Sequence, residues 1–89
     1  MEDLQAKKTN IIFEDGSTYS GDFINFHRHG FGTYSKLDGT FYEGQWYKNE
    51  KNGFFRYKLP EDEESKHAIF SKDQLKIDNL SPDSINFNI

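Results

Sequence analysis

The sequence predicts an all-β protein, a single-layer antiparallel meander of β-hairpins with a polar, largely irregular C-terminal tail. Three observations predict it: aromatic residues and glycines alternate at spacing two, a 23-residue segment repeats, and no window before residue 60 has the 3.6-residue apolar period of a helix. Thirteen of the fifteen aromatic residues lie between Phe13 and Tyr57, and all seven glycines lie between Gly16 and Gly53. The sheet is therefore expected in that part of the chain.

An internal repeat explains this uneven composition. Shifting the sequence by 23 residues places residues 15–34 on residues 38–57 with seven identities, and Phe23 opposite Trp46 is a further aromatic match. The identical residues are mostly glycines and aromatics, which chance seldom aligns together. The repeat predicts copies at residues 15–37 and 38–57 within a sheet that covers residues 11–57.

Each copy has the pattern of a β-hairpin. Two aromatic residues flank a glycine at spacing two, so all three share one face of a strand. These sets are Tyr19, Gly21 and Phe23 in the first copy and Tyr42, Gly44 and Trp46 in the second. The set Gly30, Gly32 and Tyr34 predicts the returning strand. Asp15-Gly16 and Asp38-Gly39 are turn dipeptides between strands.

These residues carry a family resemblance. Gly16-x-x-Tyr19-x-Gly21-x-Phe23, the segment from His29 to Tyr34, and the segment from Gly39 to Trp46 resemble the MORN (membrane occupation and recognition nexus) repeat. The resemblance covers about residues 15–57, or about two repeats. It implies hairpins stacked edge to edge in one twisted sheet, with scaffolding and interaction roles rather than chemistry.

The resemblance also assigns roles to individual residues. The aromatic ladder that packs the sheet and docks partners is expected to comprise Tyr19, Phe23, Tyr34, Tyr42, Trp46, Phe55 and Tyr57. The structural glycines are expected to be Gly16, Gly21, Gly30, Gly32, Gly39, Gly44 and Gly53.

Two departures from the family pattern bear on the fold. The hairpin turns read Asn25-Phe26 and Lys48-Asn49 instead of Asn-Gly, and a phenylalanine does not easily take positive φ, so the first turn is expected to differ. Phe55 stands where the first copy has Gly32. Its ring would fill the space that a following repeat needs, so the second copy is expected to be the last regular hairpin.

The repeat extends weakly beyond these copies. Residues 9–13 match the returning strand of an earlier copy, and residues 66–70 open a possible degenerate third hairpin, with Ser65 and Ile69 in the places of Tyr42 and Trp46. The expected organisation is an N-terminal arm (1–10), the repeat sheet (11–57), an acidic loop with the degenerate hairpin (58–70), and a tail (71–89). The tail is either disordered or ordered by a partner.

Charge and composition limit the function classes. The whole net charge of −4 lies after residue 60, and the neutral body lacks the basic stripe of a nucleic-acid binder. The chain has no Cys, which excludes thiolate chemistry. It shows no nucleophile elbow, phosphate loop or metal-ligand set, and His27 and His29 fit a solvated loop. We expect no enzyme, no cofactor, no metal and no nucleic acid.

The expected function is a non-catalytic structural or adaptor subunit of a larger protein assembly. A small single-layer sheet leaves one apolar face and two edges uncovered, so a stable lone monomer is not expected. The alternative is a peripheral membrane module that binds anionic phospholipid through Arg28, Lys48 and Lys51 at the hairpin ends. The resemblance implies a cytoplasmic, cytoskeletal or ciliary setting; a mitochondrial or other membrane-complex accessory subunit is the alternative.

Overall fold

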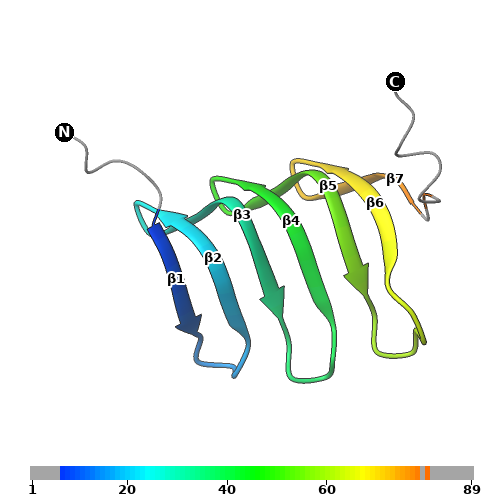
Figure 1. Cartoon of the computed structure of the whole chain (residues 1–89), viewed down its shortest axis with the longest axis horizontal. Helices are drawn as coiled ribbons and strands as arrows, with labels where there is room; N and C mark the ends of the chain where they lie inside the picture. The colour runs from blue at the N-terminus through cyan, green and yellow to red at the C-terminus, as the bar shows by residue number, and fades with distance from the viewer. Residues whose placement is uncertain (1–6, 79, 81–89) are drawn as a thin grey trace.

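The chain forms one seven-stranded antiparallel sheet in which the strands follow sequence order (Figure 1). This computed structural model describes residues 7–78 and residue 80. The strands are β1 (Lys7–Ile12), β2 (Thr18–Ile24), β3 (His27–Ser35), β4 (Phe41–Tyr47), β5 (Glu50–Lys58), β6 (Lys66–Ser71) and β7 (Gln74–Ile77). The all-β, single-layer meander is confirmed. Among the described residues none forms a helix that could span a membrane.

Three two-residue turns join β2 to β3, β4 to β5 and β6 to β7 along one end of the sheet (Figure 1). Both residues of every turn have positive φ, including Asn25 at 51° and Phe26 at 65°. Such turns match the right-handed twist of the strands. The expectation that Phe26 changes the first turn is therefore wrong: the two-residue connection imposes the same geometry, and the Phe26 side chain stays 89% exposed.

The longer loops at the other end of the sheet depend on an aspartate. The carboxylate of Asp15 accepts the backbone N–H of Ser17 at 2.9 Å and its hydroxyl at 2.6 Å. The carboxylate of Asp38 accepts the N–H of Thr40 at 2.9 Å. Because the charged form accepts these hydrogen bonds, the pKa of each aspartate lies below its usual value. Both Asp-Gly turns stand where the sequence predicts them.

The sheet extends further than the repeat predicts. β1 begins inside the expected N-terminal arm, and β7 lies inside the segment expected to be tail, so the third hairpin is complete. The expected alignment of this hairpin is off by one residue. Phe70, not Ile69, takes the place of Trp46, since Phe70 faces Gly53 as Trp46 faces Gly30. The acidic loop before β6 is one residue longer than the loop before β4, and this shifts the frame. The rest of the expected tail, residues 79 and 81–89, lies outside the described residues.

Phe55 does not end the regular array. Its ring is fully buried, and it pairs across β5 and β6 with Ala68, which replaces the glycine of the earlier copies. The rings of Trp46 and Phe70 contact it edge-on, with centroids at 5.2 Å and 5.4 Å. The expected crowding is relieved because the third hairpin carries Lys66 in the place of Tyr42.

The core is a row of rings on one face of a single layer. The buried apolar residues are Tyr19, Trp46, Phe55, Tyr57, Ala68 and Phe70. Half-buried residues packed against them are Phe13, Phe23, Tyr34, Tyr42 and Leu59. These rings cover one another along the sheet, so this face excludes water without a second layer.

Candidate interaction surfaces

Two cations lie across the ring face at equivalent places of successive hairpins. The guanidinium carbon of Arg28 lies 4.4 Å from the centroid of the Trp46 ring. The Nζ of Lys51 lies 4.7 Å from the ring centroid of Tyr42 and 5.2 Å from that of Phe70. Burial lowers the pKa of Arg28. Cation–π attraction and the apolar stems of these side chains complete the cover of the rings.

Each of these cations is bound to the turn of the next hairpin. The N–H of Asn49 donates to the carbonyl of Arg28 at 2.9 Å, and its side-chain oxygen accepts the backbone N–H and the Nε of Arg28 at 2.9 Å and 3.1 Å. Asp73 binds Lys51 in the same way, through backbone bonds of 2.9 Å and 2.7 Å and an ion pair of 3.2 Å. The two sites differ in charge, because one turn supplies an amide and the other a carboxylate.

These contacts decide where the three residues expected to contact lipid lie. Arg28 and Lys51 lie against the rings and not at the free tips of the turns. Lys48 lies in a turn and is exposed, with its Nζ 5.4 Å from the ring centroid of Tyr47. The structure therefore does not gather the three on one exposed surface, and lipid binding stays a prediction.

The tyrosines of the ladder hold polar contacts within the sheet. The buried Tyr19 hydroxyl donates to the carbonyl of Asp22 at 2.7 Å, and burial raises the pKa of Tyr19 to about 12. Tyr42 stacks on Tyr57 with centroids 5.6 Å apart. The Tyr57 hydroxyl donates to the Asp78 carboxylate, and burial together with this bond raises the pKa of Tyr57. These side chains serve the interior of the sheet.

One glycine of the predicted set shows why the ladder needs glycine. A Cβ at Gly32 would overlap the hydroxyl end of the Tyr19 side chain, so only glycine lets that ring lie on the backbone. The remaining predicted glycines lie in the Asp-Gly loops (Gly16 and Gly39) or in the strands (Gly21, Gly30, Gly44 and Gly53).

The opposite face carries a second set of rings that is exposed. Phe31, Tyr47 and Phe54, on β3, β4 and β5, keep 48%, 50% and 39% of their surface accessible. A polar row crosses the same face, where Arg56 pairs with Glu43 at 2.8 Å and Glu43 accepts the Thr33 hydroxyl at 3.3 Å. Since the polar row is satisfied within the sheet, the exposed rings are the groups left to bind something else.

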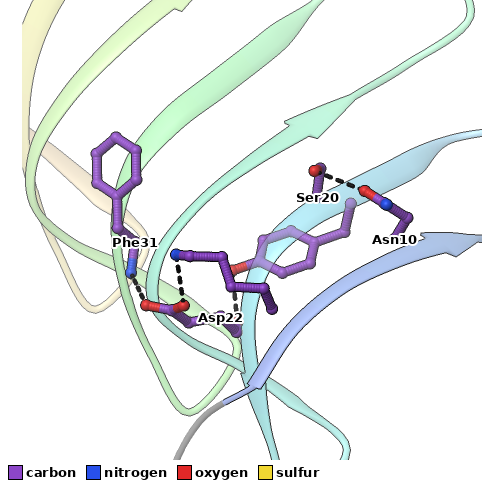
Figure 2. A network of polar contacts seen from close by, with 6 residues as sticks. Asn10, Ser20, Asp22 and Phe31 are labelled. Carbon is purple, nitrogen blue, oxygen red and sulfur yellow. Dashed lines mark hydrogen bonds and ion pairs between the residues drawn. The ribbon is translucent and has the colours of Figure 1, made fainter.

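A polar network fixes the first of these rings. Figure 2 shows the Asp22 carboxylate between neighbouring strands, where one oxygen accepts the backbone N–H of Phe31 at 3.1 Å. The other oxygen accepts the Nζ of Lys8 at 3.1 Å. Ser20 donates to the Asn10 side chain at 2.7 Å in the same view. These bonds connect β1, β2 and β3 and hold Phe31 at a fixed place on the exposed face.

The described residues contain no metal centre, since no three His, Asp or Glu side chains gather to hold an ion. His27 and His29 are engaged locally. The Nδ1 of His29 accepts the backbone N–H of Lys48 at 3.2 Å, and the Nδ1 of His27 lies 3.0 Å from the side-chain nitrogen of Asn49. Both imidazoles thus attach the second turn to β3.

The fold defines a β-repeat protein whose hairpins share a period of about 23 residues. A curated relative, MORN repeat-containing protein 3 of Xenopus laevis, is 36% identical over 62 residues, which cover 64% of this chain. The match covers 26% of the relative, so this chain spans about a quarter of that protein's matched length scale. No protein-family model matches the chain. The hairpins are MORN-type repeats, as the motifs predict.

Sequence reasoning did not identify the cations on the ring face or Phe70 in the core. The signal for the cations is present, because Arg28 and Lys51 occupy the same position of the 23-residue period. Phe70 follows Trp46 by 24 residues, so the longer acidic loop hid it from the 23-residue comparison.

Proposed function

We propose that this chain is a non-catalytic repeat module that docks proteins of a larger assembly. The observation that carries the proposal is the division of the rings between the two faces. The ladder rings bury one another, whereas Phe31, Tyr47 and Phe54 on the opposite face are 39–50% exposed. Exposed aromatic rings held on rigid strands are the usual anchors of protein interfaces.

The relative supports an interaction module, because MORN repeats generally serve protein or membrane interaction and not catalysis. Protein docking is favoured over lipid adsorption here, since Arg28 and Lys51 are occupied by rings and turn residues. The adaptor role, the partner assembly, the cytoskeletal or ciliary setting and the mitochondrial alternative are all predictions.

The test is recovery of a defined complex from cells. Tagged wild-type chain is purified and sized, and compared with a double variant, Phe31→Ser with Phe54→Ser, which removes the exposed rings. The matched control is Leu37→Ser in the β3–β4 loop, which removes an 80% exposed apolar side chain away from that face. We expect the wild type and the control to elute in the same complex and the double variant to elute alone. A complex that survives the double substitution would contradict the proposal.

A further inference from the structure

A groove on the ring face has no role in the interface described above. It has a volume of about 350 Å³ and runs along the first hairpin from the Asp-Gly loop to the turn. Four rings line it, those of Phe13, Phe23, Phe26 and Tyr34. Such a long, ring-lined hollow has the shape to receive an extended segment with a large apolar side chain.

The floor of this groove holds a charge that the chain does not neutralise at close range. Arg28 lines the groove together with Asn49, which binds it through neutral groups only. Among the described residues no carboxylate lies within ion-pair distance of the guanidinium. Asp15 also lines the groove, but its carboxylate is bound to Ser17.

The second hairpin provides an internal comparison. There the cation is Lys51, and Asp73 supplies the carboxylate in the place of Asn49. Trp46 also takes the place of Phe23 and fills the equivalent space with a larger ring. In the described part of the sheet, therefore, an open hollow and an uncompensated cation coincide over the first hairpin.

Phe26 adds an independent indication. Its φ of 65° is a conformation that costs a bulky residue about 1–2 kcal/mol, and its ring is 89% exposed at the mouth of the groove. Nothing in the fold needs a ring at this place, because the other two turns have Asn49 and Asp73 there. A strained, exposed ring beside a hollow is a feature expected of a binding site.

We propose that this groove binds an extended peptide segment of a partner protein that carries a large apolar side chain next to an aspartate or glutamate. The rings receive the apolar side chain, and Arg28 pairs with the carboxylate. This inference rests on the proposed function and names the chemistry of one partner segment.

The test starts from a display library of random twelve-residue peptides selected on the wild-type chain. We expect the selected peptides to combine a large apolar residue with a neighbouring Asp or Glu. The best one is synthesised with a fluorophore, and also in a form with Gln or Asn in place of its acidic residue. Loss of a charged hydrogen-bond partner is expected to weaken binding about tenfold or more.

The decisive variant is Asn49→Asp. It places a carboxylate beside Arg28 as Asp73 does beside Lys51, in a turn position where aspartate is already accommodated, so the fold is expected to persist. Binding of the acidic peptide is expected to fall about tenfold. Gln45→Glu, exposed on the opposite face, adds the same charge and is expected to leave binding unchanged. Circular dichroism melts check that both variants fold.

The proposal is overturned if no peptides are enriched, if the enriched peptides lack acidic residues, or if Asn49→Asp binds as the wild type does. An equal loss in Gln45→Glu would also overturn it, because the effect would then be general charge repulsion. These results are separate from the complex test with the Phe31 and Phe54 variant, so the groove can fail while the interaction module stands.

Discussion

The guanidinium of Arg28 lies 4.4 Å over the ring of Trp46, and this contact closes the interior of a sheet that has no second layer. Lys51 lies 5.9 Å from the same ring, from the next hairpin. Trp46 is only 4% exposed as a result. The sheet thus uses the stems of its own cations where a two-layer fold would use a second element.

Trp46 is expected to be the largest single contributor to stability. Its replacement by Ala removes the ring that contacts Tyr19 at 5.9 Å and Phe55 at 5.2 Å, and this should cost about 3–5 kcal/mol in urea unfolding. The control is Tyr47→Ala, a 50% exposed ring on the neighbouring position, with an expected cost below about 1 kcal/mol. Equal costs for the two would contradict the assignment of the core to one face.

Alkaline pH is expected to destabilise the fold through Tyr19. Its pKa is about 12 in the folded chain and 10.0 as an unperturbed group, so the folded state holds the proton more tightly. Its contribution is complete below pH 10.0 and is lost as the pH rises toward 12. Urea midpoints measured over this range should decline less in Tyr19→Phe than in the wild type. Equal declines would show that Tyr19 is not the group responsible.

Acid is expected to weaken the Asp-Gly loops. Asp15 and Asp38 have pKa values below 3.8 in the folded chain, so their contribution is complete above pH 3.8 and is lost as the pH falls through the lowered values. The double variant Asp15→Asn with Asp38→Asn keeps an oxygen acceptor but does not titrate. Its melting temperature should therefore depend less on pH in this acid range. An unchanged acid dependence would assign the effect to other carboxylates.

The repeat logic of the sequence predicts the sheet well because spacing two and the 23-residue period are local signals. Tyr19, Gly21 and Phe23 lie on one strand face as their spacing requires. The third hairpin was only partly predicted, since one extra residue in the acidic loop moves Phe70 out of the frame. Periodicity reports a register only while loop lengths stay constant.

The interaction surfaces could be predicted less well, because they depend on contacts between hairpins. Sequence reasoning treated Arg28 and Lys51 as free loop cations. Their place on the rings follows from the register shifts after Gly21 and Gly44, which turn Arg28 toward Phe23 and Lys51 toward Trp46. A bulge of this kind leaves little trace in composition or spacing.

Binding to anionic vesicles is expected to be weak. Of the three basic residues expected at the hairpin ends, Lys48 alone lies exposed in a turn, and one lysine near an anionic surface contributes about 1 kcal/mol. Sedimentation with phosphatidylserine vesicles at low salt should leave most of the protein in solution. Strong, salt-sensitive binding that Lys48→Gln abolishes would instead support the membrane module.

Replacing Phe26 by glycine separates stability from binding. Glycine takes positive φ without strain, so Phe26→Gly should stabilise the fold by about 1 kcal/mol in urea unfolding while it removes a ring from the groove. The peptide selected on the wild type should bind this more stable variant more weakly. Asn25→Gly, at the neighbouring turn position outside the groove lining, is the control and should leave peptide binding intact. If Phe26→Gly is stabilised and binds the peptide as well as the wild type, the ring has no part in recognition, and its strain needs another cause.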